Sequence, residues 1–516
     1  MIQMTITSLG FIIFVLAASL IYYITPHRFQ WISLLFISIV FYCLAAEPYT
    51  IIFIVISTLI IYFSALYAKK HSGSGRVAFS ITIAAIVLNA FIWFLFKGSA
   101  YWIQLSSFIH ARVPAFPAMG GLPFAAALGM GYYTCQAIGY TVDCYWGTAE
   151  PQDNFFKLFL FLIFFPQLTT GPISHYNRLL PIYEGRVFDL YRMQRGMQRI
   201  LWGFFKKLVI SERIAILVNA IDGNRSSFNG IWLLIALLFY PLQLYTDFSG
   251  SVDIVLGTAE ILGIELPENF DNPFFSQSSQ EFWQKWHMSL GNWAKDYIMY
   301  PVLKAKKTLE LSSGVRKKYG KRAGKLVSLG IGVFFTWFVT GFWHGNYKYI
   351  VGCGMLYFVV MILYEAFSPL LKRLNDLLGV KEDSFSWKLF RMIRTYIIFS
   401  FSLIFFRADG ISEAIGMIRD LFLSFTPGIF NPWIFFNGEL LSAGLTDVDF
   451  HIIWISVILL ILAAILRDKY GYARNWVALQ GRIFRWCVWL LLLTLVMVYG
   501  KYGPGYHAAD FIYQGF

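Results

Sequence analysis

Long apolar stretches, separated by short polar connections, make up most of this chain. A transmembrane helix needs about 20 largely apolar residues, and twelve stretches approach that length. They are residues 5–24, 29–46, 49–68, 77–96, 123–145, 155–172, 229–246, 326–344, 347–366, 388–406, 448–466 and 484–500. The pattern predicts an all-α protein with about 11–13 transmembrane helices. Segments 196–219 and 281–303 are aromatic but charged, so we expect them to be interfacial, tilted or buried within the bundle.

Composition supports a polytopic membrane protein over a soluble one. Hydrophobic residues make up 58% of the chain and charged residues only 14%, whereas soluble proteins carry about 25% charged residues. The net charge of +13 is typical of basic cytoplasmic loops, which orient membrane proteins, so we do not expect nucleic-acid binding. The five cysteines form no CxxC pair, which indicates small buried apolar residues and neither a disulfide framework nor a metal site.

Two basic loops set the predicted orientation. Loop 69–76 and loop 304–325, which holds nine Lys and Arg residues against the single acid Glu310, should face the cytoplasm. The count of crossings then conflicts with the basic segment 178–213 unless one neighbouring stretch fails to cross. Stretch 155–172 contains Pro166 and ends in Gly171-Pro172, so it is either a broken, re-entrant piece or an ordinary kinked helix.

Histidine chemistry is the main catalytic candidate. The apolar run Phe334–Gly345 ends on Trp343-His344-Gly345, where a buried imidazole could take a proton from an attacking hydroxyl. On a continuous helix from 281 to 296, His287 would share a face with Trp283 and Trp286. The two histidines flank one cytoplasmic loop at different depths, so a shared site would need a tunnel or funnel through the bundle.

Other chemistries lack their usual signatures. The sequence contains no HExxH, GxSxG, phosphate-binding GxxxxGK[ST] or GxGxxG motif. His344 is nevertheless one of eight histidines, and a membrane histidine often serves only in packing or hydrogen bonding. The residues alone therefore leave a structural and a catalytic interpretation open.

Several sequence blocks resemble the membrane-bound O-acyltransferase (MBOAT) family. The chain is most similar to its alginate O-acetyltransferase branch, which is related to the teichoic-acid D-alanyl transferase. The blocks include Leu122-Pro123 to Gln136, Asp143 to Gly147, Phe164 to Ile173 (FFPQLTTGPI), Tyr245 to Gly250 (YTDFSG), Asn269 to Pro273, Glu281 to Leu290 (EFWQKWHMSL), Phe342 to Gly345 (FWHG) and Ala509 to Phe516. Their order and spacing carry the resemblance more than any one block does.

The resemblance implies a fold and a set of site residues. It implies one membrane-embedded domain with a central tunnel or funnel, divided into N-terminal helices 1–122, a catalytic core 123–366 and C-terminal helices with an aromatic tail 367–516. His344 would be the catalytic histidine and His287 the second functional one, while Tyr513 would relay the acyl group or dock the tail. The residues expected to line the tunnel or bind substrate are Asp247, Trp343, Trp286, Asn269 and Gln136.

The implied function is transfer of an acetyl group across a bacterial inner membrane. A cytoplasmic thioester, acetyl-CoA, would be the donor substrate, with no bound cofactor and no metal. An extracellular or cell-wall polysaccharide would be the acceptor, and a separate extracytoplasmic acetyltransferase would be a partner. Two alternatives stay open: D-alanyl transfer from an acyl carrier protein to teichoic acid, and a non-enzymatic polysaccharide transporter. Departures from the branch, such as Ser251-Val252 in FSGSVD and Gln284-Lys285 before His287, bear on the substrate more than on the chemistry.

Overall fold

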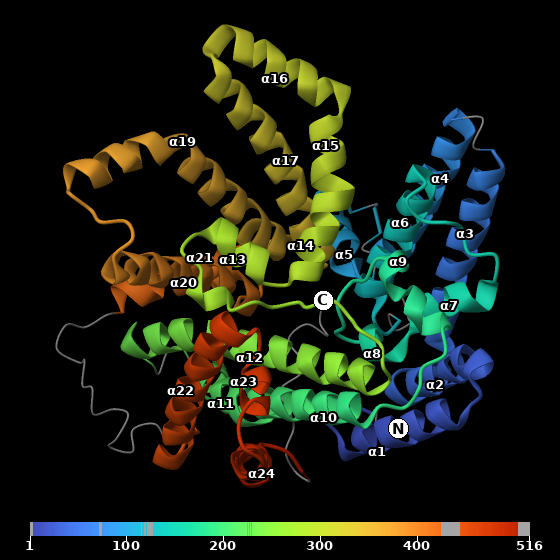
Figure 1. The fold of residues 1–516 in the computed structure, drawn as a ribbon. Coiled ribbons are helices and arrows are strands. Elements are labelled where there is room, and N and C mark those ends of the chain that lie inside the picture. Colours follow the sequence, from blue (N-terminus) through green and yellow to red (C-terminus); the bar gives the residue numbers. More distant parts are fainter. Residues whose placement is uncertain are drawn as a thin grey trace.

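Helices form most of the described part of the chain. The computed structural model describes residues 4–71, 75–114, 116–117, 120, 127–223, 225, 228, 230–424 and 444–503. Within these ranges the one β-type pairing is an isolated antiparallel bridge between Phe270 and Trp286. In Figure 1 the short helices α13 and α14 lie near the middle of the molecule, whereas α16 lies at its periphery. The fold is thus the predicted all-α bundle.

Nine helices in the described part of the chain are long and apolar enough to cross a membrane, and all nine were predicted. They include or consist of α2 (Gln30–Ala45), α3 (Ile51–Lys70), α4 (Gly75–Phe96), α12 (Gly230–Ile261), α17 (Lys321–Trp343), α19 (Leu356–Leu377), α20 (Phe385–Arg407), α22 (Asp447–Tyr470) and α24 (Arg482–Tyr499). The first predicted span is the shorter apolar helix α1 (Leu9–Ile24). The protein is therefore a multi-pass membrane protein.

Shorter helices connect these spans. They are α5 (Ser99–His110), α6 (Met130–Trp146), α7 (Phe155–Ile163), α8 (Phe165–Leu168), α9 (Tyr176–Leu179), α10 (Leu190–Phe204), α11 (Glu212–Gly223), α13 (Ser279–Lys285), α14 (Met288–Ala294), α15 (Tyr300–Lys304), α16 (Lys306–Tyr319), α18 (Tyr347–Tyr349), α21 (Ile411–Leu423) and α23 (Ala473–Ala478). The predicted span 123–145 corresponds to α6, whose 17 residues start later than expected.

The predicted span 155–172 is not one helix. Helix α7 ends at Ile163, Phe164 leaves the helical conformation, and α8 adds only four residues before a buried non-helical stretch to Ser174. At 1.5 Å per residue, the nine residues of α7 extend about 14 Å, less than half of a hydrocarbon core about 30 Å thick. Pro166 lies at the start of α8, where its missing N–H is tolerated. The broken form is therefore the correct one of the two that the sequence allowed.

The charged segment 196–219 is buried within the bundle. It runs through α10, the π-helical turn η4 (Phe205–Ser211) and α11, and it packs along α12. Small residues allow this close approach: a Cβ at Gly203 would lie 2.6 Å from the carbonyl oxygen of Gly250. The Lys207 ammonium forms buried ion pairs with Asp247 and Glu212. An isolated charge is costly to bury inside a membrane protein. Pairing the Lys207 ammonium with carboxylates offsets that desolvation cost.

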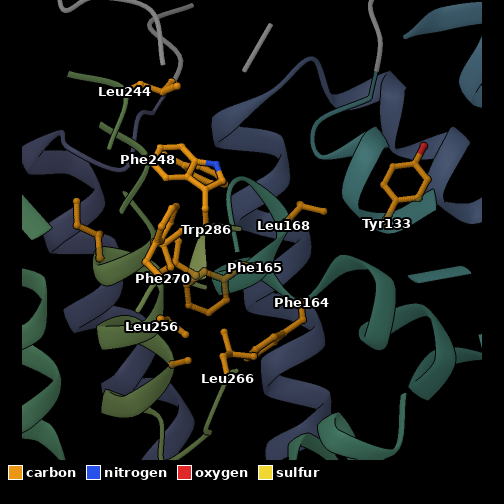
Figure 2. Close-up of a cluster of buried hydrophobic side chains, with 14 of the residues drawn as sticks. Tyr133, Phe164, Phe165, Leu168, Leu244, Phe248, Leu256, Leu266, Phe270 and Trp286 are labelled. Carbon is orange, nitrogen blue, oxygen red and sulfur yellow. The ribbon is translucent and has the colours of Figure 1, made fainter. Parts of the chain in front are cut away.

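An aromatic cluster joins the broken segment to the centre of the bundle. Figure 2 shows Phe164 and Phe165 in the same cluster as Phe248, Phe270 and Trp286. The Phe270 and Trp286 rings lie edge to face at 5.1 Å between centroids, a favourable arrangement for aromatic pairs. This cluster supports the loop and the short helices that carry His287.

Replacing Gly203 by alanine tests the close packing of α10 on α12. The added methyl group would meet a backbone carbonyl, so the helices must separate, at a cost of about 1–3 kcal/mol. We expect the midpoint of thermal unfolding in detergent to fall. The matched control is Gly416→Ala in α21, where a Cβ meets nothing within 4 Å and helix propensity favours alanine. An unchanged midpoint for Gly203→Ala would show that the helices are not in close contact there.

Candidate functional site

The helix expected over residues 281–296 is interrupted at its centre, which corrects the sequence prediction. Helix α13 ends at Lys285, Trp286 is extended, and His287 adopts a left-handed conformation with φ of 47° before α14 begins. His287 and Asn272 are the two described residues other than glycine with positive φ. Such conformations cost free energy and persist where surrounding contacts enforce them.

The loop before α13 enforces the break. We call the pairing of residues 269–271 with residues 285–288 the clamp. In the clamp, the Asp271 N–H donates to the Lys285 carbonyl at 2.9 Å, and the Met288 N–H donates to the Asn269 carbonyl at 3.0 Å. These bonds lie on either side of the bridge between Phe270 and Trp286. The local sequence favours a helix, but pairing with a distant loop prevails.

Charged side chains hold the clamp from two sides. The Arg199 guanidinium on α10 binds both carboxylate oxygens of Glu268, at 2.7 and 2.6 Å. Arg467 on α22 donates to the Asp271 carboxylate and to the Phe270 carbonyl, both at 2.9 Å. Planar guanidinium groups suit such paired recognition. The position of His287 therefore depends on helices from both halves of the chain.

His344 occupies the end of the predicted apolar run. It follows α17 directly as its C-terminal cap, and Gly345 then takes φ of 83°, a conformation suited to glycine. The imidazole of His344 packs against Trp343, Tyr349 and Phe406, with ring centroids 5.1–5.8 Å apart. A Cβ at Gly345 would lie 3.0 Å from the Lys97 carbonyl oxygen. His344 is thus fixed between α17, α20 and the segment after α4.

One cavity reaches both histidines. Its volume is about 730 Å³, and His287 and His344 are both part of its lining. One side of α17 forms a wall, through Leu329, Val333, Thr336, Trp337 and Thr340. The cavity also extends to charged residues, namely Lys295, Lys325, Glu365 and Arg394. The site therefore combines buried imidazoles, an apolar wall and an ionic region.

Burial determines the charge of the two imidazoles. The residues are only 3% and 5% exposed, and they lie outside the membrane-spanning helices, between α13 and α14 and after α17. Burial lowers the pKa of both, and the positive charge of Lys97 acts in the same direction on His344. Both rings are therefore neutral at pH 7, the form that can accept a proton.

The structure brings three of the other predicted residues, Trp286, Asn269 and Trp343, to these histidines. Trp286 lines the cavity, and Asn269 hydrogen-bonds to His287. Trp343 packs against both imidazoles and donates from its indole to the Gly131 carbonyl of α6 at 3.2 Å. Gln136 is buried on the same helix, 4% exposed.

Two predicted residues lie elsewhere or outside the described chain. Asp247 is not part of the cavity lining and pairs with Lys207, while its neighbour Phe248 packs on His287 at 4.9 Å between ring centroids. Tyr513 lies outside the described residues. Within the described ranges, no group of three or more His, Cys, Asp or Glu side chains could hold a metal ion. The roles given to the site residues stay predictions, although the structure places all of them except Tyr513.

The sequence interpretation missed several cavity residues. Cys353 and Arg394 line the cavity, and Tyr132 of α6 packs near His287, with ring centroids 6.4 Å apart. The wall of α17 did carry a signal, because Val333, Trp337 and His344 follow helical spacing along one face. Reading that face backwards from His344 would have identified the wall. No comparable local signal marks Cys353 or Arg394, which come from other helices.

A multi-pass helical bundle with two buried neutral histidines beside one cavity is an arrangement that suits group transfer within a membrane protein. Residues 147–406, about half of the chain, match the model of the membrane-bound O-acyltransferase family. The chain belongs to this family, and the enzyme is an O-acyltransferase.

Three relatives illustrate the range of similar proteins. The protein named "Probable alginate O-acetylase AlgI" of Pseudomonas syringae pv. tomato is 26% identical over 409 residues, 78% of this chain and 72% of the relative. The peptidoglycan O-acetyltransferase of Helicobacter pylori is 24% identical, over 57% of this chain and 56% of the relative. The teichoic acid D-alanyltransferase of Bacillus subtilis is 27% identical, over 59% of this chain and 72% of the relative.

Replacing Gly345 by alanine tests whether the turn after α17 positions His344. A left-handed alanine costs about 1–2 kcal/mol, and its methyl group would press on the Lys97 carbonyl. Since small displacements of reacting groups lower rates steeply, we expect acyl transfer to fall about tenfold or more. Gly379→Ala is the matched control, because φ is 62° and a Cβ meets nothing within 4 Å. Equal activity of both variants would contradict a positioning role for the turn.

Proposed function

We propose that this enzyme moves an acetyl group from a cytoplasmic thioester across the membrane for O-acetylation of an extracytoplasmic polysaccharide. The observation that carries the proposal is the single cavity lined by both His287 and His344. The names of two relatives, an alginate O-acetylase and a peptidoglycan O-acetyltransferase, support acetyl as the transferred group and a glycan as the acceptor. A bacterial inner membrane is the matching location.

The proposed reaction needs one base and one shielded thioester. The neutral imidazole of His344 accepts the proton of the attacking hydroxyl while the oxygen forms a bond to the thioester carbonyl carbon. The carbon–sulfur bond then breaks, and the sulfur leaves with the proton as a thiol. His287, in the same cavity, assists by orienting the acyl group or accepting a proton. Indole walls from Trp283 and Trp337 limit access of water, which would otherwise hydrolyse the thioester.

Acetyl-CoA is the proposed donor. Three cations at the charged region of the cavity, Lys295, Lys325 and Arg394, outnumber the single acid Glu365. This excess of positive charge favours a phosphate-bearing donor. A phosphopantetheine carrier protein also bears a phosphate, and the similarity to a D-alanyltransferase keeps D-alanyl transfer as the second candidate. A separate extracytoplasmic acetyltransferase is the proposed partner that completes glycan modification.

His344→Ala tests the proposed function. The variant lacks the proton acceptor, so we expect loss of O-linked acetyl groups on envelope glycans, by at least the hundredfold that general-base catalysis typically contributes, about 10²–10⁴. The measurement is mass analysis of released acyl groups, with transfer from radiolabelled acetyl-CoA by purified enzyme. His71→Ala, at the end of α3 and outside the cavity lining, is the control. Undiminished acetylation by a fully expressed His344→Ala enzyme would overturn the assignment, and released D-alanine would favour the second candidate.

Lys295→Gln tests the proposed charge recognition of the donor. Loss of one cation at the cavity should raise KM for acetyl-CoA about threefold to tenfold, as expected from a surface charge interaction near 1 kcal/mol. The change in kcat should be small, and added salt should reduce the difference between variant and wild type. Lys306→Gln on exposed α16, outside the cavity lining, is the matched control. Equal KM values in both variants at low salt would contradict this role.

A further inference from the structure

One oxygen atom organises the immediate surroundings of His287. The side-chain oxygen Oδ1 of Asn269 accepts from the Ser289 N–H at 3.0 Å and from the Ser289 hydroxyl at 2.9 Å. It also lies 3.3 Å from Nδ1 of His287. Asn269 is fully buried, at 0% exposure. Three groups therefore converge on one amide oxygen that water does not reach.

The bonds from Ser289 identify the atom that faces His287. The two ends of an asparagine amide are otherwise hard to distinguish, but a backbone N–H can only donate. The Asn269 atom that it contacts is therefore the oxygen, an acceptor. Since an acceptor must meet a donor, the proton of the neutral His287 ring lies on Nδ1. Its lone pair for chemistry is then on Nε2.

We propose that Asn269 is a positioning residue that fixes His287 in the Nδ1–H tautomer, so that Nε2 is the ring's proton acceptor. Nδ1 is turned towards Asn269, which is not part of the cavity lining, whereas His287 itself is. The proposed catalytic use of Nε2 rests on the proposed acyl transfer. The tautomer itself follows from the clamp geometry and can be tested without any reaction.

The clamp explains why this contact is stable. The Asn269 backbone carbonyl accepts from Met288, so the same residue holds both the backbone and the ring of His287. The left-handed φ of His287 turns the side chain out of helical register. A regular helix would leave Asn269 and the imidazole with no fixed relation. Backbone pairing and tautomer control thus have a common origin.

The titratable groups around His287 come from two other elements. His344 follows α17 and would lower the pKa of His287 only when it is itself protonated, and Tyr132 of α6 packs beside the ring. Both are neutral near pH 7, because burial lowers the pKa of His344 and a buried phenol keeps its proton. A charge introduced at position 269 would therefore act on His287 from closer than any of these groups.

Nitrogen NMR of histidine-labelled enzyme in lipid tests the tautomer directly. We expect the His287 signals, assigned by their loss in His287→Ala, to show a protonated Nδ1 and an unprotonated Nε2. In Asn269→Leu, which has similar volume and no acceptor, the two tautomers should mix. A wild-type His287 with the proton on Nε2 would overturn the proposal, whatever the donor or acceptor of the enzyme.

Kinetics then test the consequence for catalysis. Asn269→Leu should lower kcat about tenfold or more, with KM for acetyl-CoA unchanged, because ring orientation and not binding is lost. Asn269→Asp keeps the acceptor and adds a negative charge, which favours protonation of His287. Activity should persist, but the pH at which activity is lost on acidification should rise by about 1–3 pH units. If Asn269 had only a structural role, this acidic part of the pH profile would not shift. Ser289→Ala, which removes one other donor to Oδ1, is the control and should leave the pH profile unchanged.

The outcomes separate the two proposals. If Asn269→Leu does not fold, the pH profile of Asn269→Asp and the wild-type NMR signals still decide the tautomer. An Nδ1–H ring in an enzyme that transfers nothing from acetyl-CoA would leave the tautomer correct and the proposed function wrong. An active enzyme whose Asn269→Asp variant keeps the wild-type pH profile would support acyl transfer and contradict a positioning role for Asn269.

Discussion

The clamp between residues 269–271 and residues 285–288 is the constraint on which the rest of the site depends. It converts what would be one amphipathic helix into two short helices with a left-handed histidine between them. A backbone in that conformation exposes N–H and C=O groups that membrane lipid cannot satisfy. The clamp satisfies them within the protein, with bonds from Asp271 and to Asn269. His287 can therefore leave helical register in the middle of the bundle.

The buried arginines Arg199 and Arg467 help to hold the clamp in place. A buried ion pair is weak support for stability by itself, because desolvation offsets much of the attraction. Arg199 and Arg467, however, bind opposite ends of the segment Glu268–Asp271. Removing either would leave a carboxylate beside the clamp with an unmatched charge. We therefore interpret these pairs as fixing the loop's position more than as adding stability, which fits the known use of polar groups for structural specificity.

Sequence alone predicted the features that depend on local pattern. Nine spans follow from apolar length, and His344 was located because it ends one of them. The break at His287 could not be predicted this way, since EFWQKWHMSL has helical spacing and its break depends on bonds to Asn269, 18 residues earlier. For Asp247 the sequence suggested a place in the cavity lining that the structure does not show. A motif placed it near the site, but its side chain turns to Lys207 while the adjacent Phe248 reaches His287.

Trp343 links the two histidines into one unit. Its indole packs on His287 and on His344, with ring centroids 6.2 and 5.1 Å apart, and its N–H is held by the Gly131 carbonyl. A Cβ at Gly131 would lie 3.1 Å from the same indole, so α6 leaves room for this ring and little more. One imidazole is held by a loop clamp and the other by a helix end, yet a single aromatic side chain sets the spacing between them. In the proposed reaction, acyl transfer through the cavity would therefore depend on the packing of α6 against Trp343 as well as on the two histidines.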